Sequence, residues 1–269
     1  MSALEFTILG CGFSGGVPRA DGTWGKCDPA EPKNHRSRCS IMVRRGAGAD
    51  TTTLVVDTSP DFRLQAVAAG VQRLDAVILT HDHADQTHGL DDVRGFFMRQ
   101  GAPIPTYMDA VCRETMERRF DYAFHTQGGY LAICQARPAP PHGQAWSVEG
   151  PGGAIPVLGF DQDHGEVRSI GLRFGGVAYS SDVVDFPEAS HAALAGLDVW
   201  IVDALRLAPH PTHAHLDKTL GWIERFRPKH AILTNLHNEF DYNALRARVP
   251  DGVEAAYDGL RFESSISTG

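Results

Sequence analysis

Residues that could bind a divalent metal gather in one short stretch of the chain, which reads Thr80-His81-Asp82-His83-Ala84-Asp85-Gln86-Thr87-His88. His81 and His83 stand two residues apart, and Asp85 follows after two more. Zinc and similar ions need imidazole and carboxylate donors that converge on one point. A lone His-x-His arises by chance on protein surfaces, but three alternating ligand-type residues are a stronger signal. The stretch therefore predicts a metal site.

The residues around this stretch predict the elements that must hold it. The apolar run 74–79 is short and rich in β-branched residues, which favours a buried strand. After the motif, Val93, Phe96 and Phe97 recur at a helical spacing. The ligands therefore fall where a strand turns into a helix, and loops at strand ends commonly carry functional side chains.

Other residues that could bind a metal or a substrate also follow strand-like runs or begin a helix. An aspartate at a strand end can orient a ligand imidazole through a hydrogen bond. A histidine at a helix start lies near positive dipole charge, which favours its neutral form and attracts anions. The candidates of these kinds are Asp57 after 52–56, His164, Asp182, His213 before the helix 216–226, and His237 after 229–234.

Strand and helix patterns alternate in both halves of the chain, and the candidate ligands fall at strand ends. This organisation favours the α/β class, with two mixed β-sheets packed face to face and helices outside. With 269 residues, one large domain over 1–263 is expected, followed by a disordered serine-rich tail over 264–269. Residues 121–150 are expected to form an insertion or lid whose role the sequence does not identify.

Composition and charge narrow the classes of partner. The formal net charge is −8 and no basic run is present, which argues against a nucleic-acid partner. No run of about 20 apolar residues is present, so no membrane span is expected. The N-terminus shows no signal-peptide pattern, and the five cysteines lack CxxC spacing. Reduced thiols and a cytoplasmic location are therefore expected.

The motif at residues 80–85 is similar to the signature of the metallo-β-lactamase superfamily, His-x-His-x-Asp-His. Its extension, His88-Gly89-Leu90-Asp91-Asp92, looks like the PhnP phosphodiesterase branch and, more distantly, the RNase Z nucleases. The resemblance implies a four-layer αβ/βα sandwich over nearly the whole chain. One departure is plain, because Gln86 stands where the family motif has its last histidine.

The resemblance also implies a set of ligands for two divalent ions, Zn²⁺ or Mn²⁺. The first ion would bind His81, His83, His164 and Asp182. The second would use Asp85, the bridging Asp182 and a last ligand, with Gln86 in place of a histidine. An amide binds zinc more weakly than imidazole does and suits manganese better, so the second site is expected to be weak, exchangeable or tuned to Mn²⁺.

Two assignments within that set depend on position. The family often has its last ligand directly after Leu-Thr, where Asn235 stands, but His237 lies two residues on and would face the same way along an extended chain. We assign His237, and the choice between the two stays open. The resemblance assigns catalytic roles to Asp85 and to His213, which would contact the phosphate and protonate the leaving group.

The resemblance implies a metal-dependent hydrolase, and a phosphodiesterase cleaving a small phosphodiester is the leading interpretation. The substrate would be a cyclic ribose phosphate or a nucleotide, attacked by a metal-activated hydroxide. One alternative is an RNase Z-like RNA-processing nuclease. Another is a nucleotide-binding protein with a degenerate site, because Gln86 and Asn235 depart from the family pattern. A homodimer is expected from the resemblance alone.

Overall fold

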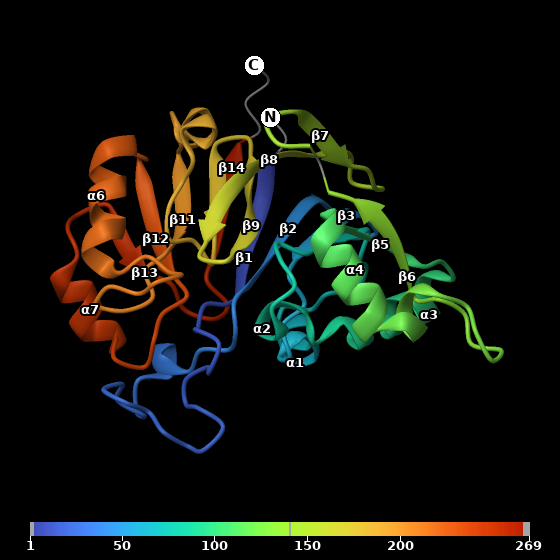
Figure 1. Cartoon of the computed structure of the whole chain (residues 1–269), viewed down its shortest axis with the longest axis horizontal. Coiled ribbons are helices and arrows are strands. Elements are labelled where there is room, and N and C mark those ends of the chain that lie inside the picture. The colour runs from blue at the N-terminus through green and yellow to red at the C-terminus, as the bar shows by residue number, and fades with distance from the viewer. Residues whose placement is uncertain (1–2, 140, 266–269) are drawn as a thin grey trace.

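Two β-sheets of seven strands lie face to face, with helices covering the outer face of each (Figure 1). This computed structural model describes residues 3–139 and 141–265. The arrangement confirms the predicted α/β class and the four-layer αβ/βα sandwich. The chain builds one sheet mainly from its first half and the other from its second half.

The first sheet has the strand order β14-β1-β2-β3-β4-β5-β6. Its strands are β1 (Ala3–Gly10), β2 (Ser40–Ala47), β3 (Asp50–Val56), β4 (Ala76–Ile78), β5 (Ile104–Met108), β6 (Cys134–Pro138) and β14 (Arg261–Ser265). The helices of this half are α1 (Phe62–Ala68), α2 (Ala84–Thr87), α3 (Arg94–Gln100), α4 (Ala110–Arg119) and α5 (Asp121–Phe124), with 3₁₀ turns at Pro32–Asn34 and Leu90–Val93.

The second sheet has the order β13-β12-β11-β10-β9-β8-β7, and its strands β10 to β13 pair in parallel. The strands are β7 (Ala145–Val148), β8 (Ile155–His164), β9 (Val167–Phe174), β10 (Val177–Ser180), β11 (Val199–Asp203), β12 (His230–Thr234) and β13 (Val253–Ala255). The helices are α6 (Leu216–Phe226) and α7 (Tyr242–Arg248), with a 3₁₀-helix at Glu188–Leu194.

The central strands are apolar on both faces because each face is covered. In β4, Ala76 and Ile78 pack between the two sheets, whereas Val77 packs under the helices of its own half. In β11, Ile201 likewise lies between the sheets, and Trp200 packs against the outer helices. Side chains alternate along a strand, so a continuous apolar run is what a strand buried on both faces requires.

Two expectations about the edges of the sheets need correction. Residues 121–150 do not form only an insertion or lid, because they supply β6 and β7, the edge strands of the two sheets. β13 and β14 do not pair with each other, since β13 pairs with β12 and β14 with β1. Ser264 and Ser265 belong to β14, and residues 266–269 of the expected disordered tail lie outside the described residues.

One apolar cluster joins the halves, because it contains residues of β1 to β4 and of β8 to β12. This shared core supports our proposal that residues 1–263 form one domain. Within the described residues, no helix is both long enough and apolar enough to cross a membrane. The five cysteines are all buried and free.

Candidate metal centre

Polar residues follow or close six strands whose ends lie near one another, namely β3, β4, β8, β10, β11 and β12. Three of these residues, Asp57 after β3, Asp182 after β10 and Asn235 after β12, adopt left-handed backbone conformations with φ of 62°, 52° and 60°. Among the described residues other than glycine, the remaining one with positive φ is Arg227, at the end of α6. Backbone strain of this kind concentrates at functional sites.

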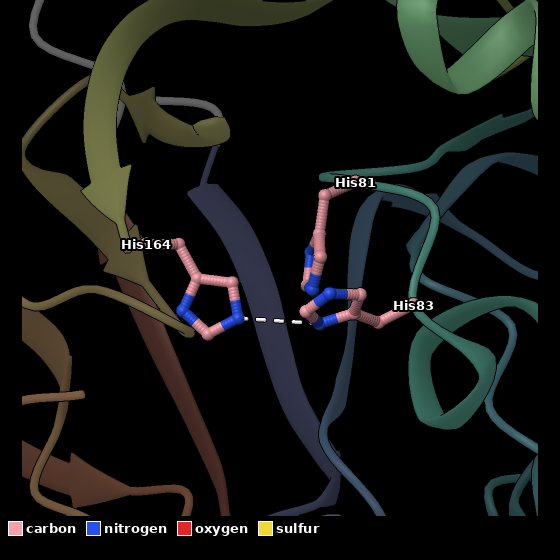
Figure 2. Close-up of side chains that lie close together, drawn as sticks. All are labelled: His81, His83 and His164. Atoms are coloured by element: carbon pink, nitrogen blue, oxygen red, sulfur yellow. Dashed lines mark hydrogen bonds between the residues drawn. The ribbon is translucent and has the colours of Figure 1, made fainter. Parts of the chain in front are cut away.

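Three histidines from the two sheets meet at the centre of this edge (Figure 2). His81 and His83 follow β4, and His164 ends β8 on the opposite side. His83 Nδ1 lies 3.2 Å from His164 Nε2, and the ring centres of His81 and His83 are 4.5 Å apart. One nitrogen from each ring lies within 4.8 Å of the others, which is a spacing suited to one metal ion.

The protonation of these rings fits metal binding. Burial lowers the pKa of His81 to about 3 and also lowers that of His164, so both are neutral at physiological pH. A neutral imidazole is the form that binds a metal. His81 Nε2 is buried and has no hydrogen-bond partner, an unusual condition that a bound ion would relieve.

Hydrogen bonds outside the cluster orient two of the rings. His164 Nδ1 donates to the carbonyl of Thr212 at 2.7 Å, so Nε2 is the unprotonated nitrogen and faces the cluster. His81 Nδ1 lies 3.0 Å from the Thr80 hydroxyl, which donates to Asp57 Oδ2 at 2.9 Å. Asp57 therefore contacts His81 through Thr80 and not directly. The expected role of Asp57 in orienting the ring stays a prediction, and these two contacts support it.

Asp182 supplies a carboxylate beside the histidines. Its Oδ1 lies 3.9 Å from His164 Nε2 and 4.0 Å from His213 Nδ1, and these three side chains form a second group of converging atoms. His213 Nδ1 is engaged by Asp203 at 2.8 Å, so it has no lone pair to give to an ion. Burial raises the pKa of Asp182, but His81 and the other histidines outweigh burial and lower that pKa to about 2. Asp182 is therefore an anion, as a metal ligand must be.

Sequence reasoning missed the partner of His213. Its Nδ1 donates to Oδ2 of the fully buried Asp203 at 2.8 Å. Burial lowers the pKa of His213, but Asp203, Asp182 and Asp85 outweigh it and raise that pKa to about 9, so the neutral form expected at a helix start is wrong for this residue. Burial also raises the pKa of Asp203 to about 6. Asp203 ends β11, and Asp182 follows β10. This shared position at a strand end was the signal in the sequence that could have identified Asp203.

A cavity of about 230 Å³ opens beside the cluster. Asp85, His213 and His237 all line it. Burial, followed by repulsion from Asp182, raises the pKa of Asp85 to about 6. The His237 ring packs on Phe13 with ring centres 4.4 Å apart, and its Nε2 lies 3.2 Å from a guanidinium nitrogen of Arg19. The full lining is Phe13, Ser14, Asp85, Leu205, Arg206, His210, His213, Asn235 and His237.

The predicted site residues thus fall into two sets. The structure brings His81, His83, His164 and Asp182 together, with Gln86 Nε2 3.0 Å from Asp182 Oδ2. Asp85 and His237 lie nearby on the cavity wall, but among the described residues neither belongs to a group of three converging ligand atoms. Their assignment as ligands stays a prediction.

Comparisons with known proteins match the sequence and the fold of this chain. The sequence profile of the beta-lactamase superfamily domain matches residues 52–235. The crystal structure of a new diphosphatase from the PhnP family has a TM-score of 0.84 and 34% identity, and the alignment covers 98% of each chain. The zinc-bound structure of PqqB from Methylobacterium extorquens shares the fold, with a TM-score of 0.70, 19% identity, and coverage of 96% of this chain and 99% of that one.

A curated relative aligns over the same length. An octanoyltransferase of Porphyromonas gingivalis is 26% identical over 263 residues, which is 96% of this chain but only 51% of that protein. The chain therefore spans about half the length of this relative. The profile match and the 34% identity over nearly the whole chain show that this protein belongs to the metallo-β-lactamase superfamily of hydrolases and, within it, to the PhnP family.

Proposed function

We propose that the protein is a metal-dependent phosphodiesterase that cleaves a small phosphodiester, either a cyclic ribose phosphate or a nucleotide. The observation that carries this proposal is the convergence of His81, His83 and His164 with the Asp182 carboxylate beside a small cavity. The same cavity is lined by Arg206, and Arg19 contacts its wall, so cations lie where an anionic phosphate would enter.

The donor set of His81, His83, His164 and Asp182 would hold the ion. A bound divalent ion would lower the pKa of a water molecule and neutralise charge on the phosphoryl group. His213 would protonate the leaving oxygen through Nε2, since Asp203 occupies Nδ1 and holds the ring in place. Asp85, on the same cavity wall, would accept the proton of the attacking water through its carboxylate.

A second candidate bond is a diphosphate linkage. The structure that is 34% identical to this chain is described as a diphosphatase. A P–O–P bond presents the same tetrahedral phosphoryl group with a phosphate as leaving group, so the same side chains could act on it. Diester and diphosphate substrates therefore belong in one experiment.

The experiment measures hydrolysis of bis(p-nitrophenyl) phosphate and of a nucleoside diphosphate by metal-stripped protein reloaded separately with Zn²⁺ and Mn²⁺. We expect turnover of the diester that needs metal, and an Asp182→Ala variant should lose it. Turnover of the diphosphate alone would replace the first candidate with the second. Metal uptake without turnover of either compound would contradict both and favour the nucleotide-binding alternative.

The RNA-processing alternative is disfavoured by charge and by size. The net charge is −8, and the cavity holds about 230 Å³. A binding curve for RNA that falls steeply with salt would revive it. The expected homodimer and the cytoplasmic location stay predictions, and light scattering would test the first.

A further inference from the structure

The second half of the predicted metal centre contains N–H donors at the positions where a second ion would need free lone pairs. The N–H groups concerned are those of the Gln86 and Asn235 amides and of the Arg19 guanidinium that faces the ring of His237. A ligand atom cannot give the same lone pair both to a metal ion and to a hydrogen. The contacts of each residue therefore decide whether a second ion can bind.

Asp182 is the residue that would bridge two ions, either with one oxygen on each ion or with one oxygen shared by both. Its Oδ1 faces His164 and His213, but its Oδ2 accepts hydrogen bonds from Gln86 Nε2 at 3.0 Å and from the Ser181 hydroxyl. A carboxylate oxygen has two lone pairs, so both sites on Oδ2 are taken. Asp182 therefore offers only Oδ1, and a second ion would have to share that one oxygen with the first.

The orientation of the Gln86 amide follows from charge. Were the amide reversed, its oxygen would face the Asp182 carboxylate and repel it, so the nitrogen must point there. The side chain is only 1% exposed, and Oε1 is buried without a partner. Oε1 is thus the single atom of Gln86 that remains available, and one neutral amide oxygen is a weak ligand for zinc.

The two alternatives for the last ligand are also engaged. Asn235 Nδ2 lies 3.4 Å from Asp203 Oδ2 and 3.2 Å from His213 Nδ1, so the nitrogen of this amide faces the pair of His213 and the buried Asp203. His237 Nε2 receives a guanidinium N–H of Arg19 at 3.2 Å. A cation at that distance repels a second cation, so His237 is a poor metal ligand as placed.

We propose that the protein holds one catalytic metal ion, on His81, His83, His164 and Asp182 Oδ1, and that the amides of Gln86 and Asn235 exclude a second ion. This replaces the two-ion expectation drawn from the resemblance. The proposal rests on the proposed function in one respect, namely that the histidine cluster binds a divalent ion. Asp85 is then left to act in proton transfer and not as a ligand.

The first measurement is the metal content of the full-length protein after metal stripping and dialysis against Zn²⁺ or Mn²⁺, by elemental analysis and by the EPR signal of Mn²⁺. We expect one equivalent and the signal of an isolated ion. Two equivalents with the signal of a coupled pair would overturn the single-ion proposal and leave the hydrolase intact. If no ion were bound after dialysis against either metal, both the single-ion proposal and the proposed function would be overturned.

Two variants test the stated cause. Gln86→His together with Asn235→His removes both amides and supplies imidazoles, so it should bind a second equivalent at least about tenfold more tightly than the wild type does. Gln135→His adds a histidine at an exposed position of β6 and should leave the metal content at one equivalent. An unchanged second-ion affinity in a double variant that keeps the wild-type circular dichroism would contradict the role assigned to the amides.

Discussion

We predict that the ion pair between His213 and Asp203 stabilises the fold whether or not a metal ion is bound. The pKa of His213 is raised from 6.5 to about 9, which corresponds to about 3 kcal/mol of interaction shared among Asp203, Asp182 and Asp85. The His213 side chain is 15% exposed and the Asp203 side chain is fully buried, so solvent screens the pair weakly. Asp203→Asn should therefore remove a measurable part of this energy.

The sign of the pH dependence follows from the direction of each pKa. Because the pKa of His213 is raised by folding, its contribution to stability is fully present below pH 6.5 and is lost as pH rises through about 9. Because burial raises the pKa of Asp203 to about 6, the carboxylate is ionised only above that pH. The ion pair therefore exists between about pH 6 and pH 9.

The assay uses metal-stripped protein in a chelator. NMR should show the His213 ring titrating near pH 9 in the wild type and at least about one unit lower in Asp203→Asn. Urea unfolding should show a stability loss of about 1–3 kcal/mol at pH 7 that shrinks by pH 10. Asp198→Asn, which breaks a pair between a partly buried carboxylate and the exposed Lys229 ammonium, should cost less than Asp203→Asn does. The reasoning is refuted if the His213 midpoint does not move, or if the loss at pH 10 equals that at pH 7.

Three further predictions concern other parts of the chain. A Cβ on Gly89 would clash with the backbone of Ser59, so Gly89→Ala should cost about 1–3 kcal/mol in urea unfolding, whereas Gly95→Ala in open space on α3 should stabilise by up to about 1 kcal/mol. Thr80→Val should weaken metal binding by about 10- to 100-fold in a competition titration, and Thr80→Ser should retain wild-type affinity. Arg19→Met should raise KM for an anionic substrate by about tenfold with a smaller change in kcat, through loss of one charge-assisted contact.

The parts of the site that sequence could predict are the ones whose geometry is local or follows from strand ends. His81 and His83 lie in a single turn after β4, so their spacing alone brings the rings together. His164 and Asp182 come from a different sheet, yet each stands at the end of a strand. Strand ends meet at one edge of a sandwich, so order along the chain together with the family resemblance was enough to predict that these side chains lie close together.

The edge strands and their partners could not be predicted in the same way. β6 and β14 have exposed, polar residues because they border solvent, so they lack the apolar runs of the central strands. β13 and β14 are close in sequence but join different sheets. A strand pattern reports that a segment is extended, while its pairing partner depends on contacts far along the chain, such as Phe6 opposite Phe262.

The direction of a side-chain amide was equally beyond the sequence. Gln86 was visible as a departure from the family motif, and from its type alone it was a weakened ligand. In the structure its nitrogen faces Asp182 instead, which makes it a donor that occupies the carboxylate. A glutamine at this position could bind a second ion weakly through its oxygen or could oppose that ion through its N–H. Only the position of the acceptor, Asp182, distinguishes the two.

The backbone at the strand ends shows why the exclusion of a second ion must come from side chains. Asn235 adopts φ of 60°, a conformation in which asparagine, aspartate and histidine are all enriched among residues other than glycine. A histidine could therefore occupy position 235 at a conformational cost similar to that of asparagine. Asp182 is likewise held at φ of 52°, with its oxygens already divided between imidazoles and N–H or O–H donors. The backbone at this edge could therefore hold ligands for a second ion. The hydrogen bonds of Gln86 and Asn235 are what prevent that ion from binding.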